Sequence, residues 1–153
     1  NIKMGCVFAG RGIIPEGCSA WFLPRAMGIS KALEWCYTAR VFRSEEALDA
    51  GLVRSLHEPE DLMPAARELA REMTETSSAI SITVLRHMMW RMLGASHPIE
   101  AHRVDTAGIN ALGVSPDAKE GITAFLEKRK PAFPGRVSED LPEFFPWWEE
   151  PEF

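Results

Sequence analysis

The pattern of apolar and polar residues changes near residue 60 of this 153-residue chain. Before that point the apolar stretches are short. The opening stretch from Ile2 to Phe8 is apolar and β-prone, which predicts a strand whose partners are not obvious in the rest of the sequence. Apolar and polar residues also alternate from Leu52 to Leu56, which indicates a second short strand.

Turn and cap residues predict three brief helices between these strands. The first runs from about Glu16 to Met27, because proline suits a first helical turn and Gly28 suits a helix end, while Pro24 kinks or shortens it. Two more are predicted over 30–39 and 44–51, each with a serine as N-cap.

From about residue 60 the period becomes helical. Four helices are predicted, over about 60–75, 78–93, 98–112 and 115–129, and Pro131 ends the last. The helix over 78–93 is apolar on most sides, so we expect it to be buried or to lie in a subunit interface. The tail over 132–153 shows no period, but its aromatic residues predict that it wraps along a folded surface or a neighbouring subunit.

Composition narrows the class of protein. An apolar fraction of 46% allows a real core, and no apolar run is long enough for a membrane span. A formal net charge of -5 makes nucleic acid a poor partner. No secretion signal is evident, so we expect a cytoplasmic or organelle-matrix protein. The three cysteines lack ligand spacing, which indicates reduced, mostly buried thiols and no metal site.

Three blocks of sequence, in this order, resemble one known family. They are Arg11 to Gly28, with the pattern Pro-Glu-Gly-Cys-Ser; Thr38-Ala39-Arg40 followed by Glu45 to Val53; and Lys119 to Arg129. Together they are similar to the C-terminal half of the crotonase superfamily, the enoyl-CoA hydratases and isomerases.

The resemblance implies an α/β fold, of which this chain would be the C-terminal part. Residues 1–57 would end the ββα spiral domain, 58–130 would form a helical trimerisation region, and 131–153 would be an aromatic, acidic tail. Most of the fragment would be helical, and the partners expected are further copies in a trimer or hexamer.

Family members hold the thioester carbonyl of an acyl-CoA between two backbone N–H groups, so that an enolate can form. Those donors and the first catalytic Glu of the hydratases belong to the family's N-terminal half, which we expect to come from the same or another chain. An ungapped match places Phe8 where hydratases carry their second catalytic Glu. A phenyl ring moves no proton, so this substitution disfavours simple hydratase chemistry.

Glu16 is the candidate catalytic residue. Its Pro-Glu-Gly-Cys-Ser setting is similar to that of peroxisomal-type 3,2-enoyl-CoA isomerases, in which this Glu is the acid/base. A double-bond shift needs only one carboxylate, which takes a proton from C2 and returns it at C4. Glu16 could instead be an ordinary acidic residue at a helix start.

Phe125 and Lys128 are the candidate CoA-binding residues. They match family positions near the adenine and phosphates of a CoA that a neighbouring subunit often holds. Lys128 could equally be a cation favoured at a helix end, and Ile109 stands where hydratases often have another adenine-packing Phe.

The sequence therefore predicts an enzyme of the enoyl-CoA hydratase/isomerase family in acyl-CoA metabolism, with CoA as part of its substrate and no other cofactor or metal. The isomerase reaction is favoured. Two alternatives stay open: a hydratase whose carboxylates come from the absent half, and a CoA-binding scaffold subunit without turnover.

Overall fold

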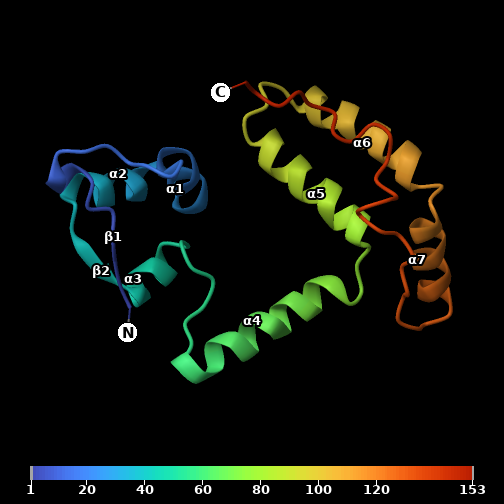
Figure 1. The fold of residues 1–153 in the computed structure, drawn as a ribbon, viewed down its shortest axis with the longest axis horizontal. Coiled ribbons are helices and arrows are strands. Elements are labelled where there is room, and N and C mark those ends of the chain that lie inside the picture. Colours follow the sequence, from blue (N-terminus) through green and yellow to red (C-terminus); the bar gives the residue numbers. More distant parts are fainter. Residues whose placement is uncertain (1, 153) are drawn as a thin grey trace. The chain divides into compact units, whose positions relative to one another are not determined.

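The computed structural model describes residues 2–152 and divides the chain into two compact units, Asn1–Ala66 and Arg67–Phe153 (Figure 1). Asn1 and Phe153, the ends of the predicted first and last segments, lie outside the described residues. The predicted division into 1–57, 58–130 and 131–153 follows expected roles rather than contacts, and it stays a prediction. Most of the regular structure is helical, as the sequence predicts.

The first unit contains a two-stranded sheet and three helices. The strands β1 (Lys3–Gly5) and β2 (Val41–Arg43) pair antiparallel, with Met4 opposite Phe42. A 3-10 helix η1 (Ala9–Arg11) follows β1. The helices are α1 (Ser19–Met27), α2 (Ile29–Thr38) and α3 (Ser44–Asp49).

The core of this unit lies around Trp35, whose side chain is fully buried. The indole stacks on Phe42 with the ring centroids 3.8 Å apart, and Cys6 and Ala47 complete the buried cluster. Each of these residues comes from a different element or from the segment after β1. The cluster therefore joins the short elements of the first unit, since none of them buries enough apolar surface alone.

One ion-pair network supports this core from the outside. The Trp35 indole N–H donates to Oε1 of Glu46 over 2.9 Å, and Arg40 donates to both oxygens of the same carboxylate. Arg40 also donates to Glu34 over 3.1 Å. The network ties α2 to α3 through the chain segment that enters β2.

Several sequence predictions for the first unit were wrong in detail. The partner of β1 is Val41–Arg43, which was not predicted as a strand, and 52–56 forms none. Instead, the N–H groups of Leu52 and Val53 donate to the Ala47 carbonyl, and both side chains pack on the core. Alternation alone did not distinguish a strand from a turn that returns two apolar residues to the core.

The helical region begins with α4 (Pro59–Thr74), which crosses the boundary between the units and has no buried residue. It continues with α5 (Ala79–Met92), α6 (Pro98–Leu112) and α7 (Pro116–Leu126). Ser78 caps α5, and Ser115 caps α7 by accepting the Ala118 N–H over 3.1 Å. These helices confirm the predicted ones, except that α7 ends three residues early.

The tail packs along its own unit, and in Figure 1 it runs back beside α6 and α5. Trp148 stacks on His87 with the ring centroids 4.8 Å apart, and the Arg91 guanidinium lies 3.5 Å from the Trp148 ring centroid. The Phe144 ring lies next to Gly108 of α6. The predicted aromatic tail along a folded surface is thus confirmed for the described residues.

None of the helices within residues 2–152 is long and apolar enough to cross a bilayer.

Candidate functional site

The first unit contains an apolar slot with a volume of about 370 Å³. Its walls come from the segment between β1 and α1 and from helices α1 and α2. The lining residues are Phe8, Ala9, Ile13, Ile14, Pro15, Ser19, Ala20, Leu23, Pro24, Ile29, Ala32, Leu33, Cys36 and Tyr37. Such a surface suits an alkyl chain rather than a charged group.

Helix α2 supplies one wall because of its periodicity. Ile29, Leu33 and Tyr37 are spaced four residues apart, so they follow one another along one side of the helix. All three are exposed, and all three line the slot. The buried residues of α2, Ala32 and Trp35, anchor the helix to the unit. The slot is therefore built on a helix that the core holds in place.

Phe8 forms another part of the slot wall. It is half-buried, precedes η1 and packs against the core cluster. An aromatic ring thus faces the slot at the position that the sequence match assigns to the second hydratase carboxylate. This ring makes that part of the wall apolar.

Glu16 lies in the turn that leads into α1. The residues on either side of this turn, Pro15 and Ser19, line the slot, whereas the exposed Glu16 side chain does not. Ser19 fixes the turn, because both its backbone N–H, over 3.0 Å, and its hydroxyl donate to the Glu16 carbonyl. The turn borders the slot, and the Glu16 side chain is exposed to solvent.

The predicted helix start at Glu16 was wrong. The helix begins at Ser19, and its N-cap, Cys18, has φ 58°. The helix dipole favours a negative charge in the first turn of a helix, and Glu16 lies outside that turn. Gly17 and Cys18, which both have positive φ, separate Glu16 from the helix.

Phe125 and Lys128 lie together at the end of α7 in the second unit. Phe125 is 82% exposed, and Lys128 follows the helix end in a left-handed conformation with φ 54°. Their predicted place inside a helix to Arg129 was wrong for Lys128, since α7 ends at Leu126. An exposed ring and a nearby ammonium are a chemically sensible pair for an adenine and a phosphate.

The neighbouring Arg129 is engaged inside the unit. It donates to both oxygens of Glu120, over 2.6 and 2.9 Å, and to Glu127 over 2.7 Å. The guanidinium, and then the Ala132 N–H, lower the pKa of Glu120 to about 2. Arg129 thus anchors the start of the tail to α7, and of the basic run 128–130 it is the residue least suited to a ligand.

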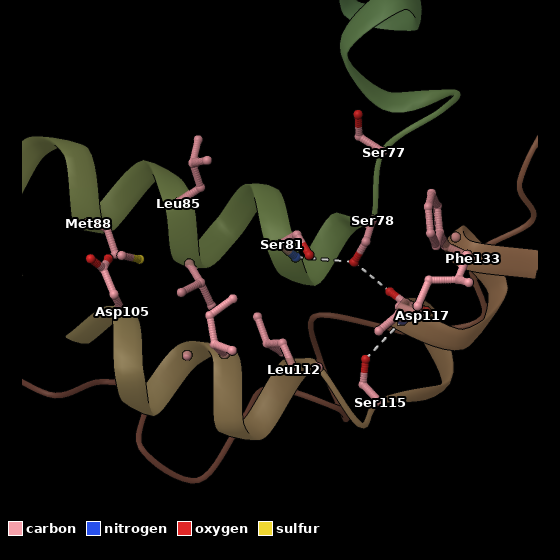
Figure 2. Close-up of a pocket in the computed structure, with 17 residues that line it drawn as sticks. Ser77, Ser78, Ser81, Leu85, Met88, Asp105, Leu112, Ser115, Asp117 and Phe133 are labelled. Atoms are coloured by element: carbon pink, nitrogen blue, oxygen red, sulfur yellow. Dashed lines mark hydrogen bonds between the residues drawn. The ribbon is translucent and has the colours of Figure 1, made fainter. Parts of the chain in front are cut away.

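A larger groove of about 920 Å³ lies among α5, α6 and α7 of the second unit (Figure 2). Its apolar floor includes Leu85, Met88 and Leu112, and none of the predicted site residues lines it. At one end, Asp117 is only 6% exposed and accepts hydrogen bonds from the Ser78 hydroxyl and from the Gly135 N–H. This buried carboxylate joins α5, α7 and the tail, which is a structural role.

The family model for enoyl-CoA hydratase/isomerase matches residues 2–136. The chain belongs to the enoyl-CoA hydratase/isomerase family. This match leaves out most of the aromatic tail.

Relatives with different reactions in their names are similar to the chain. An enoyl-CoA hydratase of Alternaria alternata is 31% identical over 140 residues, which are 91% of this chain and 47% of the relative. A trans-2-decenoyl-[acyl-carrier-protein] isomerase of Streptococcus mutans is 29% identical over 129 residues, 84% of this chain and 48% of the relative. The chain therefore spans about half the length of these relatives.

Solved structures of the family share the fold. An enoyl-CoA hydratase of Geobacillus kaustophilus superposes with a TM-score of 0.78 at 29% identity, covering 88% of this chain and 50% of that one. The predicted fold class, the C-terminal part of a crotonase-like fold that is mostly helical here, is confirmed. The roles assigned to Glu16, Phe125 and Lys128 stay predictions.

The sequence analysis missed the residues of α2 that line the slot. The sequence did contain a signal for them, because Ile29, Leu33 and Tyr37 are apolar or aromatic residues spaced four apart. Cys36 was treated only as a buried thiol, although it also lines the slot. The position of the neighbouring helix decides which apolar residues of a short helix face a cavity. Periodicity alone does not predict that position.

Proposed function

We propose that the protein containing this chain is an enzyme that acts on an acyl-CoA thioester, with the apolar slot holding part of the acyl chain. The reaction goes through an enolate whose oxygen is stabilised by N–H donors outside this chain. The CoA belongs to the substrate, and this chemistry needs no further cofactor. Family membership, together with a slot lined almost wholly by apolar side chains, supports this proposal.

Within that chemistry, we infer that the protein shifts a double bond rather than hydrates one. The observation that carries this inference is the pair formed by Phe8 and the Glu16 turn. Phe8 makes the slot wall apolar where a second carboxylate would be needed to handle water, and the Glu16 turn borders the same slot. An isomerase requires one carboxylate that takes a proton from C2 and returns it at C4.

For Glu16 to act, its side chain must turn from solvent toward the slot. The turn that carries Glu16 borders the slot, since Pro15 and Ser19 line the cavity. Rotation of a glutamate side chain costs little, and substrate binding would supply the buried position. Glu16 is thus proposed as an acid/base that is engaged in the presence of substrate.

Phe125 and Lys128 are proposed to hold the adenine and a phosphate of CoA. Their exposure and their closeness in sequence support this role. A trimer-based assembly would allow them to reach a CoA bound by a neighbouring copy. A hydratase with carboxylates from the absent half stays the alternative, because a hydratase is among the similar proteins.

Replacement of Glu16 by Gln tests the proposal. In the full-length protein, we expect Glu16→Gln to lower the turnover of a 3-enoyl-CoA by about 10²- to 10⁴-fold, the usual contribution of a positioned acid or base. The KM should change little, because the amide keeps the shape of the side chain. Initial rates at saturating substrate measure the effect.

The matched control is Glu58→Gln, which removes the same charge from an exposed position that does not line the slot. This variant should retain the native rate. Equal rates for the two variants would remove Glu16 from the mechanism and leave only the family membership.

A further inference from the structure

The apolar slot of the first unit has two distinct ends. One end is the junction between α1 and α2. Pro24, in the last turn of α1, and Ile29, the first residue of α2, both line the slot, and Gly28 lies between the two helices. The helices pack against each other. The slot therefore runs from this junction along both helices.

The other end of the slot lies at the C-terminal end of α2. The 3-10 helix η1 packs against α2, and a Cβ atom added at Gly10 would lie 2.9 Å from the side chain of Ala39, which follows α2. Phe8 directly precedes η1, and Tyr37 lies in the last turn of α2. Both side chains line the slot, so they form this second end.

The turn that carries Glu16 also lies away from the helix junction. Ser19 is the first residue of α1 and therefore the residue of this helix farthest from Gly28. It lines the slot, and its hydroxyl donates to the Glu16 carbonyl. An acyl chain whose reacting carbons lie at the Glu16 turn would therefore extend along α1 and α2 toward the junction.

Helix α2 gives the length of this path. Ile29 and Tyr37 are eight positions apart, with Leu33 midway, and a helix rises about 1.5 Å per residue, so the row is about 12 Å long. An extended alkyl chain advances about 1.3 Å per carbon, because C–C bonds of about 1.5 Å zigzag along it. The row therefore matches about nine carbons. The slot volume of about 370 Å³ is near the lower end for small-molecule sites, which suits a single chain.

We propose that the slot selects straight acyl chains of medium length, about eight to ten carbons, with the methyl end beside Ile29 and Pro24. This inference rests on the proposed function, because it takes the slot as the acyl site. Leu33 is 39% exposed and Ile29 is 59% exposed, and neither packs against the core cluster. A larger side chain at either position therefore narrows the slot without overpacking the core.

The test is the affinity of the full-length protein for butanoyl-, hexanoyl-, octanoyl-, decanoyl- and hexadecanoyl-CoA, measured by isothermal titration calorimetry. These saturated thioesters bind without being turned over by a double-bond shift. We expect the native affinity to rise by up to about fourfold for each CH₂ group that enters the slot. The rise should end near decanoyl-CoA.

Two variants shorten the path to different extents. Leu33→Trp should end the rise near hexanoyl-CoA, and Ile29→Trp should end it at a longer chain than Leu33→Trp does. Both should bind butanoyl-CoA as the native protein does. The matched control is Leu56→Trp, because Leu56 is 40% exposed and does not line the slot. This control should keep the native dependence on chain length.

A native affinity that rises through hexadecanoyl-CoA would overturn the proposal, and so would an earlier end of the rise in Ile29→Trp than in Leu33→Trp. Far-UV circular dichroism checks the fold of each variant, and Ile29→Trp decides alone if Leu33→Trp does not fold. If the expected affinities are found but no 3-enoyl-CoA is turned over, the proposed reaction fails while the selection stands. Turnover with one chain-length dependence in the native protein and both variants would refute the selection and leave the proposed function.

Discussion

At the scale of single residues, the carboxylate of Glu46 links α3 to α2 and to Arg40 in the first unit. Glu46 accepts hydrogen bonds from Arg40 and from the buried Trp35 indole. Arg40, and then Trp35, lower the pKa of Glu46 from its usual 4.5 to about 2. A carboxyl group whose pKa is lower in the folded protein stabilises the fold when it is ionised.

This pKa sets the direction of a pH dependence. The contribution of Glu46 should be fully present above pH 4.5 and be lost as the pH falls toward 2. Glu46→Gln should flatten the loss of stability in this window. Glu45→Gln removes the same charge from the same turn of α3 and should leave the acid dependence as it is in the native protein. Urea unfolding at a series of pH values measures both, and identical curves for the two variants would contradict the role of Glu46.

At the scale of elements, the second unit depends on a buried link between α5, α7 and the tail. A Cβ atom added at Gly135 would lie 2.6 Å from the Ile80 side chain and 2.7 Å from an Asp117 carboxylate oxygen. Both neighbours are buried, so neither can yield easily. A glycine therefore lets the tail pass this point without displacing either neighbour.

Gly135→Ala should lower the free energy of unfolding by about 1–3 kcal/mol, as overpacking in a core does. Gly94→Ala is the matched control, because the nearest atom to its added Cβ is 3.9 Å away. Thermal unfolding followed by circular dichroism compares the two. A Gly135→Ala variant as stable as Gly94→Ala would show that the tail does not depend on this contact.

Helices and strands could be predicted where nearby residues determine them. They could be predicted less well where they depend on partners that are distant in the sequence. The starts of α6 and α7 follow from Pro98 and from the Ser115-Pro116 pair, and the structure confirms them. The pairing of β1 with β2 was missed, because Val41–Arg43 is too short to show a period. The start of α1 was misplaced because Pro15 suits a first turn, whereas Gly17 and Cys18 adopt positive φ and delay the helix.

The candidate site was predictable in part for the same reason. Its family motif gave Glu16 and Phe8, and Phe8 lines the slot. The slot itself depends on α2 lying beside α1, and the link from Ser78 to Asp117 spans 39 positions. Neither can be read from local pattern.

At the scale of the whole molecule, the helical unit presents a wide apolar surface. Leu85 and Met89 of α5 and Leu93 directly after the helix form an exposed apolar stripe, with Met89 at 65%. Ile109 of α6 is 73% exposed. Exposed apolar patches of this kind mark surfaces that another chain covers. The expectation that the α5 region lies in a subunit interface stays a prediction.

A charge placed in that stripe should therefore weaken self-association. We expect Met89→Glu to lower the molar mass of the full-length protein in light scattering after gel filtration. Arg86→Glu, at an exposed polar position of the same helix, should leave the mass unchanged. A native protein that is monomeric at every concentration would contradict the proposed trimer-based assembly.

The central claim is that one carboxylate beside an apolar slot shifts a double bond of an acyl-CoA. The most direct measurement compares the rates at which the full-length protein consumes a 3-enoyl-CoA and hydrates the corresponding 2-enoyl-CoA. The account predicts that isomerisation of the 3-enoyl-CoA is the faster reaction, because Phe8 makes the slot wall apolar at the position proposed for the carboxylate that hydration needs. Faster hydration of the 2-enoyl-CoA would contradict it.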